Sequence, residues 1–270
     1  MAHRLIDAAN QRWSDMLRRW AIPEDLVESA PASPYFFNAG VFIAAADDAL
    51  AREIDTPSET VAREALPAGG AVIDVGVGAG AANLRLADRA GHVFAIDPSR
   101  ELLDAFADRA EHLDVGYSTI EGPWPDVASS VQGPAHVAVC HHVLYNVGDL
   151  AGFVATMVAH ASERVVVELT AVHPMAWMTP YWEALYGLSQ PDRPTVDDAV
   201  EVLTAMGVEA QQQRWERQYQ MIGEFDGDRT QWIARRLCLP PARLPELERL
   251  LAKRPPPEVR DVVTVWWDTS

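Results

Sequence analysis

Apolar positions in the first part of the chain recur every three or four residues, which is the spacing of an amphipathic helix. Residues 5–20 show this pattern first, and the segments 35–50 and 56–66 show it again after a proline-rich break. The third segment opens with Thr56 followed by a proline, a common start of a helix. We therefore expect a helical N-terminal arm over residues 1–55 and a further helix after it.

The pattern changes near residue 70, where short apolar runs begin to alternate with helical segments. Strands are expected at 71–75, 92–96, 115–120, 136–140 and 164–169, and helices at 81–90, 100–109 and 150–160. Strands that are joined by helices predict a parallel sheet with helices on both faces.

The last part of the chain has a different order of elements. Thr195 is expected to cap a helix over residues 195–206, which Gly207 ends. Segments 208–215 and 262–267 are strand-like, with two helical segments between them. Two late strands without an ordinary helical crossover predict an antiparallel pair at the edge of the sheet.

Composition and charge narrow the functions that the chain can have. It holds 22 Lys and Arg against 39 Asp and Glu, a net charge of −17, so we expect no nucleic-acid partner. No apolar run approaches the roughly 18–20 residues that cross a bilayer, so no membrane association is expected. The two cysteines, Cys140 and Cys238, and the scattered histidines have no metal-binding spacing. We expect a reduced, cytoplasmic protein without a metal site.

The most informative segment is residues 72–80, which read Val-Ile-Asp-Val-Gly-Val-Gly-Ala-Gly. It ends a predicted strand and opens a predicted helix, where glycines let the backbone and its N–H groups approach a ligand. Asp97 ends the next predicted strand, 21 residues after Gly76. An acid at this place can accept both hydroxyl groups of a ribose.

Two classes of cofactor fit this loop. Gly76, Gly78 and Ala81 match the dinucleotide fingerprint, which would indicate an NAD(P)-dependent reductase. Asp74 argues against that class, because a carboxylate two residues before the first glycine is unfavourable near a pyrophosphate. A cationic sulfonium ligand with an ammonium group would tolerate or favour it. The helical segment before the loop and the antiparallel pair at the C-terminus also argue against a dinucleotide domain.

With these motifs the sequence resembles class I S-adenosylmethionine-dependent methyltransferases, and it is similar to bacterial members with a generic methyltransferase domain. The resemblance covers about residues 58–215 and the last strand, 262–267. It implies an α/β, Rossmann-like fold: seven mostly parallel strands with an antiparallel edge strand, helices on both faces and a helical N-terminal extension. It also implies that the glycine loop packs under the methionine part of the cofactor and that Asp97 holds the ribose.

The resemblance divides the chain, taken as a single methyltransferase domain over 1–270, into four parts. They are the arm 1–55, a cofactor-binding core 56–170, a substrate-side cap and helix 171–207, and edge strands 208–270 with a helical insertion 217–258.

Further cofactor contacts carry over from the family. The loop after the third strand contacts adenine there, usually through an acid, but Pro123 stands where that acid is expected. Glu121, Asp126, or backbone and packing alone remain alternatives. After the fourth strand, a backbone carbonyl at Cys140 or His141 is expected to accept the cofactor's amino group. The full set of expected cofactor residues is Asp74, Gly76, Val77, Gly78, Gly80, Asp97, Pro98, Glu121, Gly122, Trp124, Cys140 and His141.

The methyl acceptor is expected at the same end of the sheet. Methyl transfer from a sulfonium is a direct displacement, so a general base is needed only when the acceptor must first lose a proton. His142 and His173 follow predicted strands and are the candidate bases. Aromatic residues outside the cofactor motifs are expected either to cap the acceptor or to form ordinary core: Tyr35, Phe37, Tyr145, Trp177 and Tyr181, with Tyr145 favoured as a packing residue.

The sequence thus predicts an enzyme that transfers a methyl group from S-adenosyl-L-methionine to a small molecule, leaving S-adenosyl-L-homocysteine. A cofactor-binding protein without transfer activity and an NAD(P)-dependent reductase are the alternatives. Whether the methylated atom is O, N, C or S cannot be read from the residues, and neither can the oligomeric state.

Overall fold

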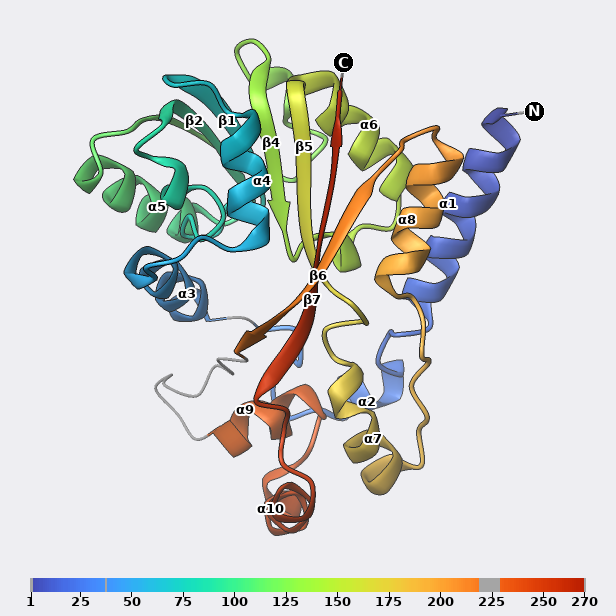
Figure 1. Cartoon of the computed structure of the whole chain (residues 1–270). Coiled ribbons are helices and arrows are strands. Elements are labelled where there is room, and N and C mark those ends of the chain that lie inside the picture. Colours follow the sequence, from blue (N-terminus) through green and yellow to red (C-terminus); the bar gives the residue numbers. More distant parts are fainter. Residues whose placement is uncertain (1, 37, 219–228, 270) are drawn as a thin grey trace.

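A seven-stranded sheet forms the centre of the protein, as seen in a computed structural model that describes residues 2–36, 38–218 and 229–269 (Figure 1). The strands are β1 (Gly70–Val75), β2 (Ala90–Asp97), β3 (Gly116–Glu121), β4 (Ala135–His141), β5 (Ala161–Thr170), β6 (Gln211–Gln218) and β7 (Val259–Asp268). Their order is β3-β2-β1-β4-β5-β7-β6. Strands β1 to β5 are parallel, and β7 is antiparallel to both β5 and β6. The predicted sheet with its antiparallel pair at one edge is confirmed.

The order of the strands places a ligand crevice. Strand β1 pairs with β2 on one side and with β4 on the other, so successive strands are added in opposite directions from this point. Open α/β sheets bind ligands beside such a switch point, outside the carboxyl ends of the strands. The glycine loop follows β1 and therefore lies at this crevice.

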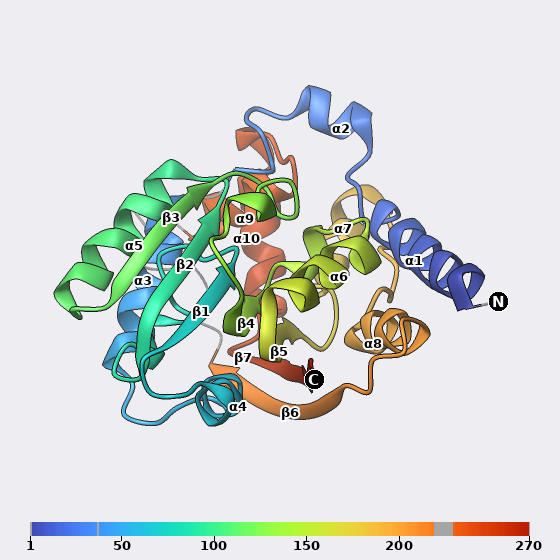
Figure 2. The same ribbon diagram turned by 90° about the horizontal axis from the view of Figure 1, so that it is seen from above.

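Helices cover both faces of the sheet, as predicted (Figure 2). On one face lie α3 (Ala39–Ala51), α4 (Pro57–Ala65) and α5 (Arg100–His112). On the other face lie α1 (Ala2–Arg18), α6 (Leu150–His160) and α8 (Val196–Ala205). Residues 1–55 are therefore shared between the two faces, because α1 packs against α8 and α3 packs against α5.

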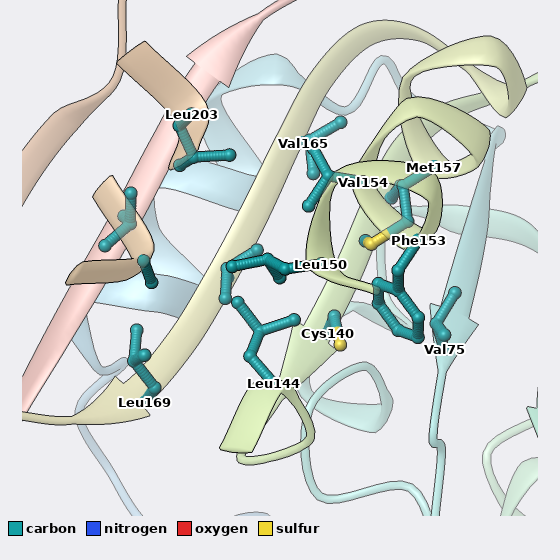
Figure 3. Close-up of a cluster of buried hydrophobic side chains, with 14 of the residues drawn as sticks. Val75, Cys140, Leu144, Leu150, Phe153, Val154, Met157, Val165, Leu169 and Leu203 are labelled. Atoms are coloured by element: carbon teal, nitrogen blue, oxygen red, sulfur yellow. The ribbon is translucent and has the colours of Figure 1, made fainter. Parts of the chain in front are cut away.

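The larger core lies between β1, β4, β5 and the second set of helices. Figure 3 shows Phe153, Val154 and Met157 of α6 pointing toward the strands, where Cys140 and Val165 meet them. Continuous apolar runs in β4 and β5 follow from this arrangement, because a parallel strand covered on both faces buries every side chain.

The predicted helix over residues 81–90 is wrong. This segment consists of turns around a short 3₁₀ helix, Leu84–Leu86, and β2 already begins at Ala90. Leu84 and Leu86 are both buried, and an α-helix would put side chains two residues apart on opposite faces. The Asn83 amide also turns inward to the carboxylate of Asp74. The glycine loop therefore has no α-helix directly behind it, and its N–H groups gain no support from a helix dipole.

A second, smaller core lies beyond the carboxyl ends of the parallel strands. It is formed by α2 (Glu24–Ser29), α7 (Thr179–Tyr186), α9 (Arg229–Arg236) and α10 (Leu244–Lys253), drawn at the bottom of Figure 1. We call these four helices the cap. Helix α2 was not expected from the sequence, because its six residues are too few to show a helical repeat.

Candidate active site

The glycine loop is fixed to the ends of two neighbouring strands. The N–H groups of Gly76 and Val77 donate to the carbonyl of Ile96 at the end of β2, at 2.8 and 2.9 Å. Gly76 has φ +78°, and a Cβ there would lie 2.5 Å from a methyl carbon of Val143 in the loop after β4. A side chain would be both strained and obstructed at this position, so glycine is required. This contact brings the loops after β1 and β4 together.

Asp97 lies beside the loop, and its carboxylate can accept further hydrogen bonds. One carboxylate oxygen accepts from the Gly78 N–H at 3.0 Å and the other from the Ser99 N–H at 2.9 Å. Burial raises the pKa of Asp97, and the two backbone N–H groups oppose this shift. Each oxygen of a carboxylate can accept about two hydrogen bonds, so each keeps one position for a hydroxyl group. The geometry fits the ribose role expected for this residue.

Asp74 lies behind the loop and is fully buried. One of its oxygens accepts from the Asn83 side-chain amide at 2.5 Å, and the other has no hydrogen-bond partner among the described residues. Burial raises the pKa of Asp74 to about 7; the Asn83 hydrogen bond opposes the shift and the charge of Asp97 adds to it. Asp74 therefore holds the loop from its inner side and presents no exposed surface to the crevice.

Several expected cofactor residues line the same edge of the sheet. Glu121 is exposed and pairs in register with Asp97, and the Gly122 N–H donates to the Asp97 carbonyl at 3.1 Å. Pro98 follows Asp97 and is exposed. Gly78 lies under Phe42 of α3, so this helix covers part of the loop. The position of Phe42 at the loop was not predicted, because the contact joins two elements that are far apart in the chain.

Two expected cofactor residues have side chains in the core. The indole N–H of Trp124 donates to the Phe153 carbonyl at 3.2 Å, and the ring packs in the larger core. The Cys140 thiol is fully buried, and both burial and the nearby Asp74 raise its pKa well above the usual value. Only the backbone of Cys140 is in a position to serve a ligand at the strand end.

A cluster of charged and titratable side chains follows β4 and β5. The buried Glu168 carboxylate lies 3.0 Å from Nε2 of His142 and 3.2 Å from Nη1 of Arg217 on β6. Nδ1 of His141 lies 3.8 Å from its other oxygen. Burial lowers the pKa of His141 to about 4, although Glu168 opposes the shift. Neither Glu168 nor Arg217 was predicted as a site residue, because the pairing of β6 beyond β7 cannot be read from local sequence.

The other candidate base, His173, is held in an aromatic stack. Its ring lies 3.9 Å from that of Trp20 and 5.4 Å from that of Tyr145. Burial, and secondarily the charge of Arg236, lowers the pKa of His173 to about 3. Such an imidazole is a weak base at neutral pH. The Tyr145 hydroxyl donates to the Thr170 carbonyl at 2.9 Å, which is a packing position.

The remaining aromatic candidates belong to the cap or lie beside it. Tyr181 is buried, and its hydroxyl donates to the Arg254 carbonyl at 2.5 Å. Trp177 meets Tyr181 edge to face. Tyr35 is exposed, and Phe37 lies outside the described residues. Tyr181 thus supports the cap from inside.

Membrane-spanning helices and metal-binding clusters are both absent from the described residues. None of the helices in residues 2–36, 38–218 and 229–269 is long and apolar enough to cross a membrane. Across the same residues, no group of three or more His, Cys, Asp or Glu side chains is arranged to hold a metal ion.

Comparisons with known proteins agree with this architecture. Residues 72–164 match a family model described as a methyltransferase domain. A methyltransferase from Geobacter sulfurreducens, solved with S-adenosyl-L-homocysteine, has a TM-score of 0.53 at 16% identity, covering 84% of this chain and 98% of that one. The YcgJ protein of Bacillus subtilis has a TM-score of 0.52 at 14% identity, covering 78% and 97%. YjhP of E. coli has a TM-score of 0.52 at 16% identity, covering 84% and 99%. No curated protein sequence matches the chain significantly.

The strand order, with the glycine loop and Asp97 at the switch point, defines the Rossmann-like class I methyltransferase fold. The match over residues 72–164 places this segment in the methyltransferase domain family.

Proposed function

We propose that the chain methylates a small molecule that binds between the carboxyl ends of β4 and β5 and the cap. The position of His142 carries this proposal. It is a half-exposed polar side chain directly before Val143, which contacts Gly76 of the cofactor loop. A group at this position is next to the place where the methyl donor is expected.

The cofactor would be held by the residues already grouped at the loop. Asp97 would accept from the ribose, the backbone of residues 76–80 would pack against the methionine part, and the 121–122 segment would border the adenine. The free acceptor positions of Asp97 and the glycine at position 76, where a side chain would collide with Val143, support this assignment.

Charge and the cap support a small acceptor rather than a nucleic acid. A net charge of −17 repels phosphate backbones. The cap covers the strand ends with its own apolar core, so a ligand there would be shielded from water on one side. Both cysteines are free and buried, which fits the cytoplasmic setting that we propose.

The test is a screen of small acceptors for formation of S-adenosyl-L-homocysteine, with His142→Gln as the matched variant. We expect turnover with at least one low-molecular-weight acceptor and none with RNA or DNA. Cofactor binding without turnover of any acceptor would favour a binding protein, and turnover on nucleic acid alone would contradict the proposal.

A further inference from the structure

Glu168 is the centre of a cluster that three strands build beside the expected acceptor position. Its carboxylate is 1% exposed, yet it contacts the loop after β4 through His142 and strand β6 through Arg217. Both of these contacts use Oε1, while Oε2 faces His141. A buried carboxylate is costly unless cations or hydrogen-bond donors compensate it, and here they do.

The charge state of Glu168 decides which nitrogen of His142 carries the hydrogen. Burial raises the pKa of Glu168, but His141, His142 and Arg217 together lower it further, so its pKa lies well below the usual value. An ionised carboxylate only accepts hydrogen bonds. Nε2 of His142 lies 3.0 Å from this carboxylate and 3.5 Å from Nη1 of Arg217, and the shorter contact is a hydrogen bond when Nε2 carries the hydrogen and donates. In the neutral ring, Nδ1 is then the unprotonated acceptor.

The backbone of His142 is held in a conformation that few residues adopt. Its φ is +59°, and its N–H donates to the Glu168 carbonyl at 2.7 Å. Its side chain is 41% exposed, whereas that of His141 is 13% exposed. The backbone N–H and the ring of His142 both contact Glu168 of β5, while much of the side chain is exposed. Residues that are held in rarely populated backbone conformations cluster at functional sites.

We propose that Glu168 and Arg217 are positioning residues that hold His142 with Nδ1 free to accept a proton from the methyl acceptor. The acceptor would accordingly carry a hydroxyl or another group that must lose a proton. This inference rests on the proposed function. The acceptor's proton passes to Nδ1, its freed electron pair bonds to the methyl carbon, and the carbon–sulfur pair stays on sulfur as the sulfonium becomes a thioether.

Arg217 has a separate part in this arrangement. A buried carboxylate is costly unless a cation or hydrogen-bond donors compensate its charge. The guanidinium of Arg217 offsets part of that charge at the same oxygen. Among the described residues, His141 and Arg52 are further charged or titratable groups at the cluster, and Arg52 is paired with Glu59 of α4.

Nuclear magnetic resonance of the full chain with ¹⁵N-labelled histidine tests the proposal without an acceptor. S-adenosyl-L-homocysteine is added, and the His142 signals are identified by their loss in His142→Gln. We expect the Nε2–H tautomer in the parent at pH 8, mixed tautomers in Glu168→Gln, and no change in Glu163→Gln, which alters an exposed acid on the same strand. An Nδ1–H tautomer in the parent would overturn the proposal even if Glu168→Gln did not fold.

The second measurement uses an acceptor returned by the screen. Glu168→Gln should lower kcat about tenfold or more with KM within about twofold, and Glu168→Asp should recover part of the loss. Arg217→Met should lower kcat in the same way, because it removes one of the two contacts to Oε1 of Glu168. A kcat within about twofold of the parent in Glu168→Gln, or no recovery in Glu168→Asp, would overturn the proposal. Absence of S-adenosyl-L-homocysteine binding by the parent would instead overturn the proposed function.

Discussion

Two carboxylates at the glycine loop have opposite surroundings. Each oxygen of Asp97 accepts one backbone hydrogen bond and keeps a position for another, whereas Asp74 is fully buried and only one of its oxygens is paired. Both were predicted as cofactor residues, because spacing from the glycines does not show how deeply each side chain is buried. In the structure, the surroundings of Asp97 fit a ribose contact, and those of Asp74 fit a residue that supports the loop.

Asp97→Ala should weaken binding of S-adenosyl-L-homocysteine by roughly ten- to a hundredfold. Hydrogen bonds to a charged group contribute about 1.5–3 kcal/mol, which corresponds to that loss. Calorimetry on the variant measures it, with circular dichroism to verify folding and Asp104→Ala, an exposed acid on α5, as the control. An affinity within about twofold of the parent would show that Asp97 does not hold the ribose.

Asp74→Asn should make the cofactor-free protein more stable than the parent at high pH. The pKa of Asp74 is raised from 3.8 to about 7, so the folded chain binds this proton more tightly than the unfolded chain. Parent stability is then lost between about pH 4 and pH 7, by as much as about 4 kcal/mol. Urea unfolding of both proteins at pH 5 and pH 8.5 measures the difference. An equal difference in unfolding free energy between the two proteins at both pH values would mean that ionisation of Asp74 does not destabilise the folded chain.

Some secondary-structure elements can be predicted from the sequence pattern alone, and others cannot. The helix over 195–206 was predicted from Thr195 and Gly207, and α8 begins one residue after Thr195, whose N–H donates to Asp198 at 2.7 Å. The segment 81–90 has helix-forming residues, yet burial of Leu84 and Leu86 and the tertiary bond from Asn83 to Asp74 override them. The contact between Glu168 and Arg217 could not be predicted either, because it depends on how two strands that are distant in the sequence align.

Helix α1 is expected to be held against the rest of the protein mainly through Trp13. Trp13 is fully buried, stacks on Tyr145 and donates to the Val147 carbonyl at 2.8 Å. Trp13→Ala should therefore cost about 3–5 kcal/mol of unfolding free energy. Leu5→Ala on the same helix, where the side chain is 60% exposed, should change it by about 0.5 kcal/mol or less. Chemical denaturation compares the two, and equal effects would mean that α1 is not docked on the sheet through Trp13.

The net charge of the protein determines which classes of charged ligand can approach the site. With a net charge of −17, the protein should bind neither a short RNA nor duplex DNA with a Kd below about 10⁻⁴ M at low salt. Fluorescence anisotropy with labelled oligonucleotides measures this, and binding at micromolar concentration that weakens with salt would contradict a small-molecule acceptor.

The cap brings together segments that lie far apart in the chain and that pattern prediction treated separately. Segments within residues 175–188 and 232–251 meet there with residues around α2. The choice of acceptor is therefore expected to depend on the cap and on His142, while cofactor binding depends on the sheet edge.

Calorimetry of the full chain with S-adenosyl-L-homocysteine and, separately, with NADH tests the central claim most directly. The loop geometry and Asp97 fit either a sulfonium nucleoside or a dinucleotide in outline, and the strand order with the methyltransferase match selects the first. The account predicts saturable one-to-one binding of S-adenosyl-L-homocysteine and no binding of NADH. Tight binding of NADH, with no measurable heat from S-adenosyl-L-homocysteine, would contradict it.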